Sequence, residues 1–231
     1  MVIRKRTSKV GIGSQRYLGI IPETRGNKAP KPKAKRNYST FEKILEKGAR
    51  QGYVPAKTKV GRDWFSDIAK TTTISANKLM SGEKSALTSS IEIGRMYAFF
   101  YDPKHKQTLP YYDRFPLIFP FADADKGFLG INLHYLPYVL RAKLMDSLYT
   151  LSTNKTYNDK TKLRLQYGVL NGAAKFKYFK PCIKHYLNAH VQSRFLEVSA
   201  DKWDIALFLP VEKFAKKGKQ AVWSDSRRMV G

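Results

Sequence analysis

Cysteine, acidic side chains and long apolar runs are all scarce in this sequence of 231 residues. The single cysteine, Cys182, excludes an internal disulfide and a cysteine-based zinc site, and it indicates a reducing compartment. The richest apolar run, Phe115–Ala122, is far shorter than the roughly 18 residues that span a bilayer. The basic residues of Met1–Arg6 are not followed by the apolar stretch of a signal peptide. These absences predict a cytoplasmic chain, or one assembled from the cytoplasm into something larger.

Catalytic motifs are missing as well. The sequence has no phosphate-binding loop, no dinucleotide-binding glycine pattern, no His-Glu-x-x-His and no Gly-x-Ser-x-Gly. His185 and His190 are five residues apart, whereas a helical metal site prefers a separation of about four. We therefore predict no catalytic residue, no metal and no cofactor. A metal-dependent nuclease stays a distant alternative, in which Asp102, Asp113 and His134 converge from neighbouring strands.

Positive charge is what the chain has in excess. Lys and Arg number 43 against 18 Asp and Glu, which gives a formal net charge of +25 at pH 7. Residues 1–36 hold eleven basic residues and one acid, and the chain from Lys213 onward holds six and one. Basic ends around a less charged middle favour a nucleic acid or another polyanion, because each cation near a phosphate releases counterions. A merely solubilising role stays open, whereas the glycines and prolines of residues 1–36 argue against a membrane-bound helix.

Three segments supply the candidate DNA-binding residues. The N-terminal segment contains Pro30–Lys33, whose alternating prolines favour an extended backbone with its lysines outward. Residues 175–180 alternate lysine with aromatic residues, which predicts an edge strand that either contacts phosphate or is simply solvated. The C-terminal segment is the third. The predicted DNA-binding residues are Arg4, Lys5, Arg6, Lys9, Lys31, Lys33, Lys35, Arg36, Lys175, Lys177, Lys180, Lys216, Lys217, Lys219, Arg227 and Arg228.

Four regions divide the chain by composition and pattern. Residues 1–37 are predicted to be an extended basic arm, and residues 38–90 a helical or irregular region. Residues 91–214 are predicted to be the α+β core domain, and residues 215–231 a loose basic tail. The fold class that follows is α+β, with a small antiparallel β-rich module flanked by helices.

The β-rich module is expected near residues 91–136. Strands are predicted at 95–101, 115–120 and 128–135, from their β-branched and aromatic content and the turns between them. The prolines of the second strand place it at an edge of the sheet. Helices are predicted over residues 39–51, where Ser39 and Glu42 form a capping box, and over 62–70, 137–148, 158–170, 182–190 and 199–209.

Aromatic residues crowd between Tyr97 and Tyr135. Most of them are expected to form the core and its rim. Stacking on unpaired bases is the alternative, because a single strand or a frayed duplex end offers free base faces.

Five stretches of the sequence resemble one phage family: Tyr97–Lys104, Leu109–Leu117, Gly127–Pro137, Phe179–Cys182 and Trp203–Pro210. They are similar to the DNA end protector, or head-completion, proteins of T-even-type contractile-tailed phages. The resemblance spans roughly residues 95–230, and none of these stretches is a catalytic motif.

That resemblance implies a virion protein that binds the end of the linear double-stranded DNA genome without base specificity. Bound there, it would protect the end from exonuclease. The partners implied are double-stranded DNA ends and other virion proteins of the head, neck or tail, with no membrane. A structural neck, tail or baseplate component, whose arms staple neighbouring subunits, is the alternative.

Overall fold

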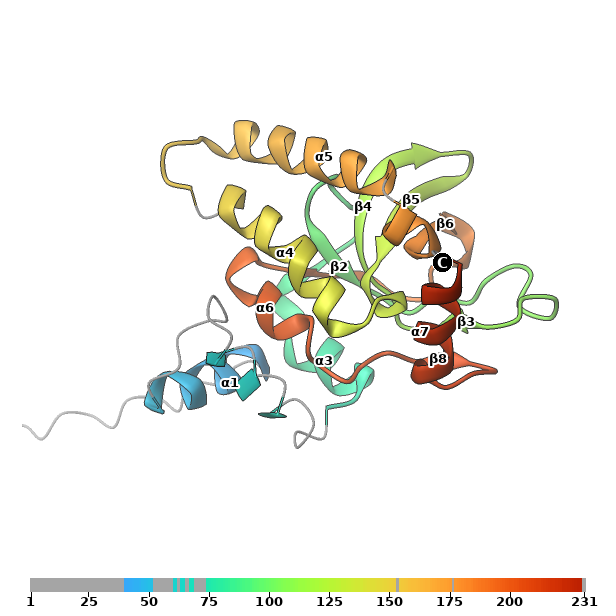
Figure 1. The fold of residues 1–231 in the computed structure, drawn as a ribbon, viewed down its shortest axis with the longest axis horizontal. Helices are drawn as coiled ribbons and strands as arrows, with labels where there is room; N and C mark the ends of the chain where they lie inside the picture. Colours follow the sequence, from blue (N-terminus) through green and yellow to red (C-terminus); the bar gives the residue numbers. More distant parts are fainter. Residues whose placement is uncertain are drawn as a thin grey trace, which may run out of the picture. The chain divides into compact units, whose positions relative to one another are not determined.

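An antiparallel sheet of six strands organises the fold (Figure 1). The computed structural model describes residues 40–51, 60–61, 63–64, 67–68, 74–152, 154–175 and 177–229. The strand order is β1-β7-β2-β4-β5-β6. The strands are β1 Leu87–Thr88, β2 Met96–Ala98, β4 Leu117–Ala124, β5 Gly127–Asn132, β6 Ile183–Leu187 and β7 Phe195–Val198. A smaller sheet pairs β3 (Tyr112–Asp113) with β8 (Phe214–Ala215). The predicted α+β class is confirmed, while the predicted N-terminal arm lies outside the described residues.

Helices pack on one face of the large sheet and share a single apolar core with it. They are α1 Thr40–Arg50, α3 Ala76–Gly82, α4 Tyr138–Ser152, α5 Asp159–Lys175, α6 Trp203–Ala206 and α7 Lys219–Arg228. Helices α4 and α5 lie side by side (Figure 1). Short 3-10 turns connect the elements: η1 Lys84–Ala86, η2 Leu133–Tyr135, η3 Lys177–Cys182, η4 Asn188–His190 and η5 Ala200–Lys202. None of the described helices has both the length and the apolar character needed to cross a membrane.

The opposite face of the sheet holds an aromatic cluster. Successive residues of a strand point to opposite faces, so Met96 joins the helix-covered core while Tyr97 joins the aromatic cluster. The Phe99 ring lies at its centre, with centroids 5.0 Å from Phe195 and 5.4 Å from Tyr186 in edge-to-face geometry. Base stacking is therefore the wrong interpretation for the buried aromatics of the 97–135 region, which are core residues.

Strand β4 is central, so its predicted edge position is wrong. It pairs with β2 on one side and β5 on the other. Pro120 lies opposite Gly130, and the register shifts between Pro120 and Ala122. A bulge at this point accommodates a residue that has no N–H for the ladder.

Other strands come from segments expected to be something else. Residues 182–190, predicted to be helical, form β6 and η4, because β6 pairs with β5 along the whole of its length. Residues 195–198, for which the sequence predicts neither helix nor strand, form β7, inserted between β1 and β2. Residues 76–88, part of the region predicted to be helical or irregular, form α3, η1 and the short strand β1. Pairing with distant strands thus overrides local preference here.

The predicted helix starts are partly confirmed. The Thr161 N–H donates to Asn158 Oδ1 at 2.8 Å, so Asn158 caps α5 as expected. The helix predicted at 39–51 is α1, but Ser39 lies outside the described residues. The Phe41 N–H of α1 donates to Glu83 Oε1 at 3.1 Å, so a carboxylate far along the chain serves its first turn. The helix predicted at 62–70 falls largely outside the described residues.

Candidate nucleic-acid interface

Half of the predicted DNA-binding residues lie outside the part of the chain that the structure describes. These residues, which stay predictions, are Arg4, Lys5, Arg6, Lys9, Lys31, Lys33, Lys35 and Arg36. The other half comes from two segments, one at the end of α5 and one at the C-terminus.

The first segment leaves α5 and enters η3. Lys175 is the last residue of α5, and Lys177 and Lys180 lie on η3. All three are exposed. The predicted alternating strand is wrong, because Lys175 still belongs to α5 and Lys177–Cys182 form the 3-10 turn η3, whose last residue, Cys182, is completely buried. The lysines therefore extend from a compact turn.

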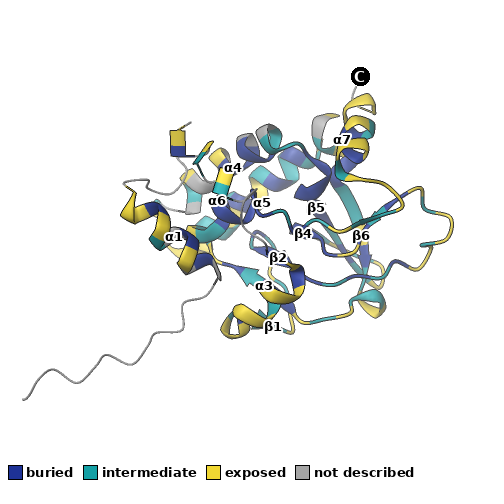
Figure 2. Ribbon diagram, turned by 90° about the horizontal axis from the view of Figure 1, so that it is seen from below, coloured by how far each residue is buried: buried dark blue, intermediate teal, exposed yellow. Residues whose placement is uncertain are grey.

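The C-terminal segment, predicted to be loose, is a folded helix over most of its length. Helix α7 has one buried and one exposed side (Figure 2). Val222 and Trp223 lie on its buried side, and the Trp223 indole N–H donates to the carbonyl of His134 at 2.8 Å. Arg227 and Arg228 lie in the last turn and are exposed, where cations also offset the negative end of the helix dipole.

Two lysines before α7 are used within the chain. Lys216, at a positive φ of 70°, donates from Nζ to two carbonyls of residues 107–109 at 2.8 Å each. Lys217 Nζ lies 2.7 Å from Asp225 Oδ2, and this hydrogen bond lowers the pKa of Asp225. Both lysines hold the loop between β8 and α7 in place, so their ammonium groups are partly occupied by contacts within the chain.

Lys219 is committed in the same way. Its Nζ lies 3.3 Å from Glu212 Oε1, in a carboxylate whose side chain is only 3% exposed. The guanidinium of Arg141, completely buried, lies 4.0 Å from the same oxygen. Burial alone would raise the pKa of Glu212, but the attraction of His134, Arg141 and Lys219 lowers it. Lys219, itself 37% exposed, thus pairs at the edge of a buried pair formed by Glu212 and Arg141.

Contact between α7 and η3 brings the two basic segments together. Lys175 and Lys180 lie on one side of this contact, and Arg227 and Arg228 on the other. Within the described residues, Lys175, Lys180 and Arg227 form no ion pair. Arg228 pairs with Asp225 at 2.6 Å, but its side chain is 81% exposed, and such pairs contribute little stability. These four exposed cations therefore belong to segments that the contact between α7 and η3 brings near each other.

Helix α5 extends this surface, a feature that the sequence interpretation missed. Lys160, Arg164 and Lys175 are all exposed, and at 3.6 residues per turn they fall within about 60° of one helix face. Between them, Gly168 and Gly172 leave open space where a Cβ would be. The sequence signal that could have revealed this face is the helical spacing of Lys160, Arg164 and Lys175. We call Lys160, Arg164, Lys175, Lys180, Arg227 and Arg228 the α5–α7 cations.

Asp113 and His134, two residues of the nuclease alternative, do meet. His134 Nδ1 donates to Asp113 Oδ2 at 2.7 Å, with side chains 0% and 2% exposed. The Asn132 amide also donates to Oδ2, and the N–H groups of Phe115 and Lys213 donate to Oδ1. Both carboxylate oxygens are thus occupied. The pair is sealed in the core, where it secures β3 to η2.

Asp102, the third residue of that alternative, lies elsewhere. Its carboxylate pairs with Lys106 at 2.8 Å, and its carbonyl accepts from His190 Nδ1. His185 Nε2 donates to the carbonyl of Asp125. In the described part of the chain, no three His, Cys, Asp or Glu side chains are grouped so as to hold a metal ion.

The described part of the chain thus combines buried polar pairs in its core with exposed basic side chains on α5, η3 and α7. A family model described as "Phage T4 terminal DNA protecting protein" matches residues 24–227. The chain belongs to this family. The match starts well before residue 95, so the family extends over a longer part of the chain than the resemblance indicated. No curated protein and no solved structure matches the chain.

Proposed function

We propose that this protein binds the ends of linear double-stranded DNA in a phage particle and protects them from exonuclease. Binding is independent of base sequence and runs through the α5–α7 cations together with the basic residues before residue 37. The observation that supports this most directly is the exposed set of Lys175, Lys180, Arg227 and Arg228, which the α7–η3 contact collects from segments far apart in the sequence. Membership of the terminal DNA protecting family agrees with it.

The dimensions of α5 suit a duplex. From Lys160 to Lys175 the helix rises about 22 Å, which corresponds to roughly six base pairs along B-DNA. Cations at both ends of this length can contact phosphates several base pairs apart on the same duplex. Protection then needs no chemistry from the protein, because a bound end is inaccessible to a nuclease. We therefore assign it no catalytic residue, metal or cofactor, and we place it in the virion after assembly in the host cytoplasm.

Salt titration of DNA binding tests the surface. The variant K175Q/K180Q/R227Q/R228Q removes four of the α5–α7 cations. A matched control, K43Q/K47Q/K78Q/K84Q, removes four exposed lysines from α1, α3 and η1, so both variants lose the same net charge. Affinity for a blunt duplex is measured by fluorescence anisotropy between about 50 and 200 mM salt.

We expect the slope of log affinity against log salt to fall by about 0.9 for each phosphate that the variant no longer neutralises. The control should change the slope far less. Equal slopes for the two variants would show that net charge alone drives binding and would refute this surface. Protection itself is measured by digesting linear duplex with a double-strand exonuclease. If the wild-type protein shows no detectable DNA binding at low salt, the proposed function is refuted. A structural component of the neck, tail or baseplate is then the better assignment.

A further inference from the structure

A pocket of about 460 Å³ lies where the segments that follow β2, β3 and η4 meet beside α3. Its volume falls within the roughly 300–1,000 Å³ that is usual for ligand pockets. The side chains that concern its chemistry are Asn77, Phe100, Asp102, Lys106, Arg114 and Gln192. We call it the Arg114 pocket.

Backbone hydrogen bonds hold the walls of the Arg114 pocket together. The Tyr101 N–H donates to the carbonyl of Arg114 at 3.1 Å, and the Arg114 N–H donates to the carbonyl of Lys213 at 2.8 Å. The Gln192 N–H donates to the carbonyl of Phe100, also at 2.8 Å. Segments far apart in the sequence are thus fixed side by side, so a ligand meets a site that is already formed and needs little ordering.

Positive charge is in excess at this pocket. Lys106 Nζ lies 2.8 Å from Asp102 Oδ2, so these two charges compensate each other. The exposed guanidinium of Arg114 forms no ion pair and no side-chain hydrogen bond within the described residues. Lys213 Nζ lies 5.4 Å from the centroid of the Phe100 ring at the pocket wall, and in the same part of the chain it has no acidic partner. Two cations therefore stay uncompensated.

Two of the cations are also held close to each other. The hydrogen bond to Asp102 raises the pKa of Lys106, whereas the positive charge of Arg114 opposes that rise. Lys106 and Arg114 thus repel each other, and an anion bound beside both of them would relieve this repulsion.

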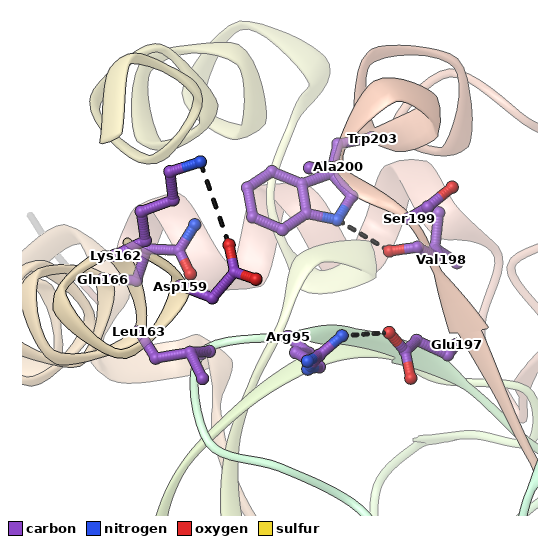
Figure 3. A pocket seen from close by; sticks show the side chains of 11 residues that line it. Arg95, Asp159, Lys162, Leu163, Gln166, Glu197, Val198, Ser199, Ala200 and Trp203 are labelled. Carbon is purple, nitrogen blue, oxygen red and sulfur yellow. Dashed lines mark hydrogen bonds and ion pairs between the residues drawn. The ribbon is translucent and has the colours of Figure 1, made fainter. Parts of the chain in front are cut away.

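The pocket beside the first turns of α5 has no such excess of charge (Figure 3). There, Arg95 Nη1 lies 2.7 Å from Glu197 Oε1, and Lys162 Nζ lies 4.0 Å from Asp159 Oδ1. Both cations of that pocket have an acid beside them. Uncompensated charge, rather than the mere presence of a hollow, therefore distinguishes the Arg114 pocket as an anion site.

The chemistry of the Arg114 pocket fits a phosphate monoester. A guanidinium binds phosphate through two parallel N–H groups, and the amides of Asn77 and Gln192 carry further N–H donors. A monoester has a charge of about −1.5 to −2 at pH 7, whereas a phosphodiester within a strand has a single negative charge. Two uncompensated cations match the larger charge. In DNA, phosphate monoesters occur only where a strand ends.

We propose that the Arg114 pocket binds the terminal phosphate monoester of a DNA end. The inference rests on the proposed function, and it explains how an end is distinguished from internal duplex, in which every phosphate is a diester. The loop that carries Lys106 is joined to the segment before α7, because Lys216 Nζ donates to the carbonyls of Gln107 and Leu109. The pocket is therefore connected to the helix that carries Arg227 and Arg228.

Duplexes that differ only in their terminal groups test this inference. Three blunt linear duplexes of one sequence carry 5′-phosphates, 3′-phosphates or only hydroxyls at their ends. Their affinities for the full-length protein are measured by competition in fluorescence anisotropy at one salt concentration. The variant R114Q removes the unpaired guanidinium, and the control R50Q removes a guanidinium that is exposed on α1. Circular dichroism confirms that both variants are folded.

We expect the wild-type protein to bind at least one phosphorylated duplex about tenfold more tightly than the hydroxyl duplex. The duplex that is preferred identifies the strand end that the pocket takes. R114Q should reduce this preference to less than about threefold, and R50Q should keep it.

Equal affinity of the wild-type protein for all three duplexes overturns the inference, even if R114Q fails to fold, and leaves the proposed function intact. A preference that folded R114Q retains in full also overturns it. Absence of binding to every duplex refutes the proposed function instead, and the inference with it.

Discussion

Replacement of Arg141 by Met should destabilise the protein strongly. Its guanidinium is completely buried and donates to the carbonyls of Leu136, Leu207 and His134 at 2.7, 2.8 and 3.3 Å. It is also the buried cation beside Glu212. Methionine keeps the apolar stem but leaves carbonyls and a carboxylate without this donor. Removing one partner of a buried ion pair costs about 3–5 kcal/mol, out of roughly 5–15 kcal/mol for a whole domain.

Urea unfolding followed by far-UV circular dichroism at neutral pH measures this loss. The control is Arg50→Met, which removes the same charge from a guanidinium that is 76% exposed and pairs with Glu46 at 2.7 Å. An exposed pair of this kind contributes about 0.3–0.5 kcal/mol. If the free energies of unfolding of the two variants differ by less than about 1 kcal/mol, the buried contacts of Arg141 do not stabilise the core as argued, and this reasoning is refuted.

Three further outcomes are expected. Burial raises the pKa of the Cys182 thiol to about 12, so it should resist a thiol reagent near pH 8 in the native state and react after unfolding; fast native reaction would contradict its burial. Gly168→Ala and Gly172→Ala should each raise the free energy of unfolding by about 0.5–1 kcal/mol, because a Cβ at either site meets no atom within 4 Å; a lower thermal midpoint would refute this. Burial alone would raise the pKa of Asp113, but His134 and the hydrogen bonds it accepts hold that pKa below its ordinary value of 3.8. Its ionised form therefore stabilises the fold above that pH, and the contribution is lost as pH falls through the lowered pKa. Urea midpoints measured from neutral pH down to acid should show this loss. In Asp113→Asn the midpoint should depend less on pH. An equal decrease of the midpoint with falling pH in the two proteins would contradict the prediction.

The β-rich centre could be predicted from residue types, because β2, β4 and β5 are strands of aromatic and β-branched residues separated by turns. The helices α4 and α5 likewise follow from their apolar spacing and, for α5, from Asn158 at its start. Strand β6 could not be predicted in this way. Its apolar residues Ile183, Tyr186 and Leu187 fit a helical spacing, and only the pairing with β5 makes it a strand.

For the candidate interface, the sequence predicts which segments are basic but not which of their side chains are free to bind a ligand. Composition identifies the C-terminal cations, but not that Lys216, Lys217 and Lys219 are held by intrachain contacts. Lys216 contacts residues far away in the sequence, whereas Lys217 and Lys219 pair with acids in the flanking segments, at separations that no helix or strand spacing predicts.

The position of β7 between β1 and β2 has a consequence for synthesis. While the ribosome has released only the chain before residue 195, β4 and β5 can already pair, but β1 has no neighbour and one edge of β2 is open. Interrupted translation therefore yields fragments with an unsatisfied strand edge, a feature that promotes aggregation and degradation. Because β7 closes the sheet late in the chain, we expect fragments that end before it to be less soluble and more readily degraded than the intact protein.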